Sequence, residues 1–295
     1  MKILILGGSG MLGHRLWVNL SQVHKTWVTV RGNGSQLPDI PEFPRKYVRP
    51  YVDALILDEM IRAIAFVQPN LVINCIGLVK QIPLANDPLS SISINALFPH
   101  QIASICSQAV IRMIHISTDC VFSGKRGQYV ESEPSDAEDL YGRTKFLGEV
   151  AYPHTVTLRT SIIGRELKVR LGLIEWFLGE KGPIRGYKKA VYTGFTTDEL
   201  SRIILNYVIP RTDLSGVYHV SSDPISKYDL LMLVKEAFGR NVTILPDEDF
   251  ISDRSLDSTR FRQMTGYSPP AWSAMIDELR RNSSLYDRIG GLTKC

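Results

Sequence analysis

The first fifteen residues constrain the fold of this chain more than any other stretch. They read MKILILGGSGMLGHR, an apolar run over residues 2–6 followed by glycines at positions 7, 8, 10 and 13 and then by apolar residues at helical spacing. A buried strand that enters a glycine turn and then a helix suits an anionic ligand, because the turn brings backbone N–H groups close to a phosphate at the helix N-terminus. We therefore expect an α/β fold whose first turn binds the pyrophosphate of a dinucleotide.

The four glycines can be aligned in two ways. Gly8, Gly10 and Gly13 form G-x-G-x-x-G, whereas Gly7, Gly10 and Gly13 form G-x-x-G-x-x-G. The spacing alone does not choose between them, and a plain glycine turn could show either pattern. The cofactor contacts expected from this stretch are Gly7, Ser9, Gly10, Met11, Leu12 and Gly13.

Strand-like and helix-like segments alternate over the first part of the chain. This alternation predicts a parallel sheet with helices on both faces, a Rossmann-type doubly wound fold with right-handed crossovers. A proline at position 50 weakens one of the strands, since proline donates no ladder hydrogen bond. The sequence predicts strands over 2–6, 26–30, 46–52, 71–75, 110–117 and 155–159 and, after the first helix, further helices over 55–66, 94–109 and 140–150.

The regular alternation stops near residue 161. Helices are expected over 169–178, 198–207 and 227–238 and from 272 onward, a loop over 181–193, and a short strand over 216–220. We interpret 1–164 as an NAD(P)-binding domain to which about 196–220 returns. Residues 165–295 would form a smaller, discontinuous α+β domain that binds the substrate.

Composition excludes several other classes of protein. The 295 residues carry a net charge of only +4 and contain no basic block, so no nucleic acid is expected as a partner. The four cysteines form no C-x-x-C pair and have no zinc spacing with the histidines, which predicts reduced thiols, a cytoplasmic location and no metal site. No segment approaches the roughly 18 apolar residues that span a bilayer, so no membrane partner is expected.

A second informative stretch is Tyr141-Gly-Arg-Thr-Lys145. Residues four apart share one face of a helix, so the ammonium of Lys145 would lie near the phenol of Tyr141 and lower its pKa from about 10. Such a tyrosine can exchange a proton with a substrate oxygen near neutral pH. The same pair also occurs on ordinary solvated helices, so its position matters.

The ends of two predicted strands indicate where a site for the Tyr141–Lys145 pair would lie. Thr118 follows the fifth predicted strand, and Cys75, Ile76 and Gly77 end or follow the fourth. Ligands of open α/β sheets bind outside the carboxyl ends of the strands. We therefore expect Thr118 to meet a substrate carbonyl there, beside a cofactor ring admitted by the small residues 75–77.

Together these blocks resemble the dTDP-4-dehydrorhamnose reductase family of extended short-chain dehydrogenase/reductases. Gly7, Gly10 and Gly13 match its G-x-x-G-x-x-G, which makes Gly8 a spacer, and residues 117–124 (STDCVFSG) resemble its S-T-D-Y-V-F-D-G block. Residues 158–161, 216–220 and 255–257 resemble later blocks, so the likeness spans nearly the whole chain. It implies NAD(P)-dependent reduction of the 4-keto group of a nucleotide-diphosphate deoxysugar, in surface polysaccharide or activated-sugar biosynthesis.

The resemblance also implies the roles of individual residues. Tyr141 would protonate the substrate oxygen, Lys145 would lower the Tyr141 pKa and bind the nicotinamide ribose, and Thr118 would orient the carbonyl. Asp53 matches a position that contacts adenine. Two departures, Cys120 for the family's Tyr and Ser123 for its Asp, suggest a different sugar. Related dehydratases carry Glu at position 120, so Cys120 disfavours dehydration.

Arg31 bears on the choice of cofactor. It lies about twenty residues after the glycine turn, where an acidic residue would bind the ribose of NAD and a cation accommodates the 2′-phosphate of NADP. We expect NADPH, with NADH as the alternative. An NAD-retaining nucleotide-sugar epimerase and a non-catalytic cofactor-binding regulatory subunit remain open as alternative functions, and a homodimer remains open as the assembly.

Overall fold

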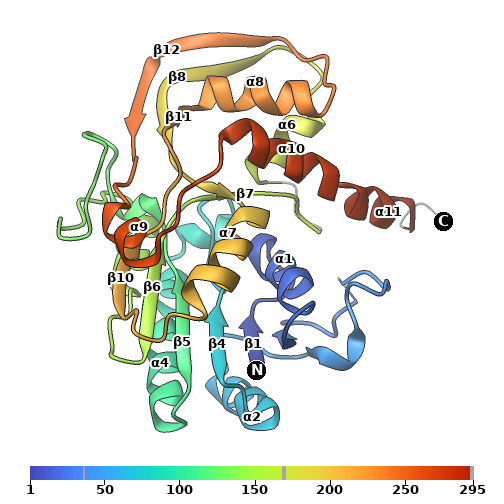
Figure 1. The fold of residues 1–295 in the computed structure, drawn as a ribbon, viewed down its shortest axis with the longest axis vertical. Coiled ribbons are helices and arrows are strands. Elements are labelled where there is room, and N and C mark those ends of the chain that lie inside the picture. The colour runs from blue at the N-terminus through green and yellow to red at the C-terminus, as the bar shows by residue number, and fades with distance from the viewer. Residues whose placement is uncertain (36, 168–170, 293–295) are drawn as a thin grey trace.

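The computed structural model describes residues 1–35, 37–167 and 171–292, and a seven-stranded parallel sheet forms its centre (Figure 1). The strand order is β10-β6-β5-β4-β1-β2-β3, and each neighbouring pair is parallel. This confirms the predicted Rossmann-type fold. The strands of this sheet are β1 (Lys2–Leu6), β2 (Lys25–Thr29), β3 (Val48–Arg49), β4 (Leu71–Asn74), β5 (Arg112–Ile116), β6 (Thr155–Arg159) and β10 (Gly216–His219).

Helices cover both faces of the sheet, which explains why β1 is apolar at almost every position. Ile3 and Ile5 pack into the core beneath α1 (Met11–Leu20) and α7 (Thr197–Ile203). Leu4 and Leu6 point to the other face, under α2 (Leu57–Val67) and α4 (Phe98–Gln108). The two faces therefore bury separate apolar clusters on either side of one strand.

Two elements of the first part differ most from their predictions. The strand expected over 46–52 is reduced to Val48–Arg49, since Pro50 cannot donate and Tyr51 turns the chain with a φ of +57°. The helix expected over 94–109 is preceded by α3 (Pro88–Ser91) and a π-helical segment, Ile92–Leu97, before α4 begins. The short 3-10 turns of the molecule are Arg45–Tyr47, Pro83–Asn86 and Asp119–Val121.

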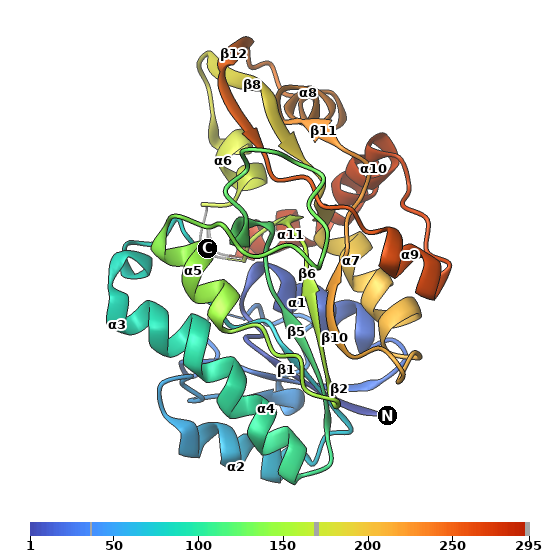
Figure 2. The same ribbon diagram turned by 90° about the vertical axis from the view of Figure 1, so that its left-hand side faces the viewer.

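A three-stranded sheet lies beyond the carboxyl edge of the large one (Figures 1 and 2). Its order is β11 (Ile225–Ser226), β8 (Ile184–Tyr192) and β12 (Ile244–Asp253), and α8 (Lys227–Ala237) packs on it. The loop predicted over 181–193 is therefore wrong. In β8, a glycine and two adjacent lysines interrupt the alternation of apolar residues that would have indicated a strand. The sequence did not predict β12.

The remaining elements lie between the strands of the two sheets in the chain or follow them. β7 (Ile162–Ile163) pairs with β9 (Phe195–Thr196), and a second π-helical segment, Ile204–Val208, continues α7. The helix predicted over 169–178 starts partly outside the described residues, and α6 spans Leu173–Gly179. The last helices are α9 (Thr259–Thr265), α10 (Trp272–Asn282) and α11 (Ser284–Leu292). Within the described ranges, no helix combines the length and apolar character that crossing a membrane requires.

Candidate active site

The glycine turn after β1 leaves the start of α1 open to an anion. Gly7 has a φ of +87°, and the N–H of Gly10 donates to the Gly7 carbonyl at 3.1 Å. α1 begins after Gly10 with no side-chain cap and no acidic residue in its first turn. The first N–H groups of the helix and its positive dipole end therefore fit a pyrophosphate.

The close contacts around the turn separate the glycines by role. A Cβ at Gly13 would lie 2.1 Å from the Gly7 carbonyl oxygen, and one at Gly8 would lie 2.4 Å from the Val28 Cβ. Gly8 is therefore not a mere spacer, which corrects the expectation. Gly10 is exposed, and a Cβ there would meet only the Gly7 oxygen at 3.4 Å, an ordinary contact. The space beside Gly10 is therefore not filled by other parts of the protein, and a ligand can approach the backbone there.

Thr118, Tyr141 and Lys145 meet at the carboxyl end of β5. The side chains of Thr118 and Tyr141 interact, since Thr118 acts to lower the pKa of Tyr141, and Lys145 Nζ donates to the Ile116 carbonyl at 2.9 Å. Thr118 also donates to Asp119 Oδ1 at 3.1 Å and accepts from the Cys120 N–H at 3.1 Å. The three residues predicted to be catalytic are thus brought together.

The helix α5 (Leu140–Leu147) that carries Tyr141 and Lys145 is fixed against the Thr118 segment. Its N-cap, Asp139, accepts from the Gly142 N–H at 2.7 Å. A Cβ at Gly142 would lie 2.3 Å from the Cys120 carbonyl oxygen, so only glycine permits this approach. The helix ends at Gly148, earlier than predicted, where the Asn95 carbonyl leaves no space for a side chain.

Burial dominates the protonation of the two titratable groups. It raises the pKa of Tyr141, and Cys120 and Asp119 act in the same direction while Thr118 opposes them. Burial lowers the pKa of Lys145 to about 8, opposed by Glu149. The predicted lowering of the Tyr141 pKa is therefore wrong: burial keeps Tyr141 a neutral phenol, and Lys145 bonds to a backbone carbonyl.

Residues 75–77 connect the glycine turn to this group. A Cβ at Gly7 would lie 3.0 Å from Ile76 Cγ1, and one at Gly77 would lie 3.8 Å from Lys145 Nζ. The Asn74 side chain holds this loop by accepting from the Ile76 N–H at 3.0 Å. Gly7, Ile76, Gly77 and Lys145 therefore form one continuous strip along the carboxyl edge of the sheet, which fits a dinucleotide.

Arg31 and Asp53 lie after β2 and β3, toward the far end of that edge. Arg31 is exposed. The half-buried Asp53 closes a turn, since its Oδ1 accepts from the Leu55 N–H at 2.9 Å. Their assigned contacts to the ribose phosphate and to adenine stay predictions.

A buried ion pair behind these three candidate residues was not found from the sequence. Arg159, at the end of β6, binds both carboxylate oxygens of Glu149, at 2.8 and 2.7 Å. Glu149 also accepts from Ser117 Oγ at 2.7 Å, directly before Thr118. Arg159 stands in a block that the family resemblance singled out, but nothing in the sequence marked Glu149 as its partner.

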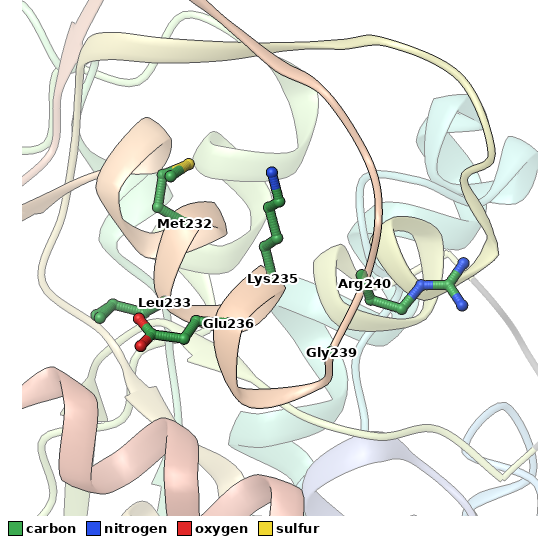
Figure 3. A pocket seen from close by; sticks show the side chains of 6 residues that line it. All are labelled: Met232, Leu233, Lys235, Glu236, Gly239 and Arg240. Atoms are coloured by element: carbon green, nitrogen blue, oxygen red, sulfur yellow. The ribbon is translucent and has the colours of Figure 1, made fainter.

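The hollow drawn in Figure 3 lies elsewhere. It has a volume of about 370 Å³, and Met232 and Lys235 project beside it from one side of α8 (Figure 3). Its lining contains none of the predicted site residues and consists of Met232, Leu233, Lys235, Glu236, Gly239 and Arg240. Within the described ranges, no cluster of three potential metal ligands is found, and Cys75, Cys106 and Cys120 are free thiols.

The chain belongs to the RmlD substrate binding domain family, whose model matches residues 1–282. The spore coat polysaccharide biosynthesis protein SpsK of Bacillus subtilis is 24% identical over 305 aligned positions, covering 97% of this chain and 99% of the relative. A dTDP-4-keto-6-deoxy-D-glucose reductase of Streptomyces niveus is 28% identical over 149 residues, 50% of this chain and 46% of the relative. The match thus spans about half the length of that reductase.

A solved structure agrees in fold. The dTDP-4-dehydrorhamnose reductase of Bacillus anthracis, determined in complex with NADP, superposes with a TM-score of 0.77 at 18% identity, covering 94% of this chain and 98% of that one. The family model confirms the family resemblance read from the sequence blocks, and the solved structure shows that the two chains share their fold.

Proposed function

We propose that this protein uses NADPH to reduce the 4-keto group of a nucleotide-diphosphate deoxysugar. The observation that carries the proposal is the meeting of Thr118, Tyr141 and Lys145 at one end of a strip that begins at the glycine turn. The Streptomyces relative, named as a reductase of such a sugar, supports the activity. The Bacillus relative, named for polysaccharide biosynthesis, supports the pathway class.

In this proposal the side chains hold the ketone and supply its proton. Hydride donation to the carbonyl carbon is the chemistry that a reduced nicotinamide supplies when bound. As the C=O double bond opens, the oxygen takes the phenolic proton of Tyr141, whose raised pKa keeps that proton in place until it is needed. Thr118 holds the same oxygen by a hydrogen bond, and Lys145 offers its ammonium to the resulting phenolate.

The substrate's nucleotide is assigned to the part of the chain beyond the large sheet. We place it against the region of β8, β11, β12 and α8, with the cofactor on 1–164 and the returning segment 196–220. Arg31, exposed at the end of β2, is the reason to prefer NADPH to NADH. A sugar that differs from dehydrorhamnose remains part of the proposal because of Cys120.

Replacing Tyr141 with Phe tests the assignment. We expect at least a hundredfold loss of kcat for NADPH oxidation with dTDP- or UDP-linked 4-keto-6-deoxyhexoses, because the proton donor is gone. Tyr152→Phe is the matched control, since Tyr152 bonds His100 on the surface, away from the trio. Undiminished turnover by the Tyr141 variant would refute the assigned role.

The same assay separates the alternatives. Conversion of one nucleotide sugar into its epimer, with tightly held NAD and no net NADPH use, would instead identify an epimerase. Failure to reduce any keto-sugar together with tight binding to a partner enzyme would identify a regulatory subunit.

A further inference from the structure

One polar side chain of α1 reaches away from the glycine turn toward α11. His14, in the first turn of the helix, is fully buried. Its Nδ1 lies 2.7 Å from the Gly10 carbonyl oxygen, and its Nε2 lies 2.6 Å from the hydroxyl of Tyr286. His14 thus joins the helix N-cap to a residue 272 positions later in the chain.

The chemistry of the partners fixes the direction of these bonds. A carbonyl oxygen only accepts, so Nδ1 of His14 carries the proton and donates it to Gly10. Nε2 is then an acceptor and takes the hydroxyl proton of Tyr286. Burial lowers the pKa of His14 to about 4, which keeps the imidazole neutral at physiological pH. The result is a directed chain from Tyr286 through His14 to Gly10.

Several contacts hold Tyr286 at this position. Its side chain is buried with Leu285 in the same core that lies beneath α1. The Arg165 guanidinium lies 4.9 Å from the centre of its ring, and Arg288 pairs with Glu42 at 2.5 Å. In Figure 1, α11 lies near α1, to its right. Tyr286 also lies beyond residue 282, where the family match ends.

We propose that Tyr286 and His14 are positioning residues that hold the dinucleotide turn in its binding conformation. The Gly10 carbonyl accepts both from His14 Nδ1 and from the His14 N–H at 3.1 Å, while the Gly10 N–H donates to Gly7. Gly10 is also the residue with room for a ligand, so the hydrogen-bond chain acts where the pyrophosphate would approach. Ordering this turn beforehand spares the cofactor that entropic cost.

The proposal rests on the proposed function only in requiring a dinucleotide at this turn. Its test is Tyr286→Phe, which keeps the ring and its packing but removes the proton donor to His14. By the usual net contribution of one hydrogen bond, we expect NADPH binding, followed by nucleotide fluorescence, to weaken roughly three- to tenfold. The kcat at saturating NADPH should stay unchanged.

Tyr267→Phe is the matched control. Tyr267 is also buried, and its hydroxyl donates to Glu199 Oε1 at 2.8 Å, so its loss removes a comparable bond without touching His14. We expect Tyr267→Phe to bind NADPH as tightly as the wild type, even if its melting temperature falls as much as that of Tyr286→Phe. Equal binding by wild type and Tyr286→Phe would overturn the proposal, and so would equal weakening in both variants.

A second measurement uses the reciprocity of binding equilibria. If α11 strengthens cofactor binding, the cofactor must stabilise docked α11 by the same factor. Undocking α11 removes at least the Tyr286 bond, so hydrogen exchange of residues 284–289 should slow by at least three- to tenfold in the wild type when NADPH is added, and by less in Tyr286→Phe. Unchanged exchange in the wild type, with NADPH shown to bind, would overturn the proposal. A wild type that binds neither NADPH nor NADH would overturn the proposed function as well.

Discussion

The two ends of the cofactor strip are built on different principles. At the glycine turn the shape comes from missing side chains: Gly13 approaches the Gly7 carbonyl so closely that no Cβ fits. At the candidate catalytic end, which carries Thr118, the shape comes from buried charges, because Glu149 and Arg159 hold Ser117 directly before Thr118. Substitutions at the turn should therefore destabilise the protein through steric strain. Substitutions at the other end should destabilise it by leaving a buried charge without its partner.

The largest effect is expected at the turn. Gly13→Ala would place a Cβ 2.1 Å from the Gly7 oxygen, and the backbone shift needed should cost about 3 kcal/mol or more of unfolding free energy. Gly10→Ala is its counterpart, since its φ of −73° suits alanine and its Cβ would make only an ordinary contact. We expect Gly10→Ala to cost about 1 kcal/mol or less and yet to bind NADPH at least tenfold more weakly. Urea unfolding and NADPH titration measure the two quantities, and equal stability of the two variants would contradict the steric account.

A slightly smaller effect is expected at the catalytic end. Arg159 and Glu149 are only 4% and 5% exposed, so Arg159→Met should cost about 3 kcal/mol by leaving the carboxylate without its cation. Replacing both residues with methionine should recover most of that loss, because no buried charge is left unpaired. The exposed pair Lys125–Glu138 is the control, and Lys125→Met should change stability by less than about 1 kcal/mol. A double-mutant cycle in urea tests this, and a double variant no more stable than the single one would contradict it.

The smallest of the three effects concerns pH and the helix behind the turn. His14 has a pKa of about 4 in the folded protein against 6.5 in the unfolded chain, so the unfolded state binds more protons between these values. Stability from the neutral His14 is therefore complete above pH 6.5 and is lost as the pH falls toward 4. Burial lowers the pKa of His219 in the same direction.

The His14 contribution can be isolated by one substitution. Between pH 7 and pH 4 both proteins should lose unfolding free energy. We expect the loss to be smaller in His14→Gln than in the wild type, by at most about 3 kcal/mol, which is the amount that the pKa difference of His14 implies. Urea unfolding at both pH values gives the comparison. Parallel losses in both proteins would show that His14 does not titrate as assigned.

How far the sequence predicted these features depends on whether a local rule governs them. β1 matches its predicted bounds because an apolar run buried on both faces is unambiguous. β6 also matches its bounds, and its sequence TVTLR combines β-branched residues with a leucine, as is typical of strands. β8 was missed because its burial comes from pairing with β12, a strand 60 residues away in register, and not from its own composition. Thr118, Tyr141 and Lys145 were found because a strand end and a helical spacing are local signals.

Other parts of the site depend on contacts that no local pattern encodes. The role of Gly8 follows from Val28 on the neighbouring strand, and the partner of Arg159 lies on the loop after α5. The pKa of Tyr141 was predicted in the wrong direction, since a spacing shows which charge is near but not how much water is lost. Burial and long-range pairing are therefore what the sequence pattern could not supply.

The contact between Gly142 and the Cys120 carbonyl bears on how this protein could acquire new substrates. That contact involves the main-chain carbonyl at position 120, so it does not depend on which side chain stands there. Position 120 can therefore change its side chain while the tyrosine–lysine helix keeps its seat. Because the half-buried side chain at 120 lies close to Tyr141, a single substitution there could change what the candidate site admits while the candidate proton donor keeps its position.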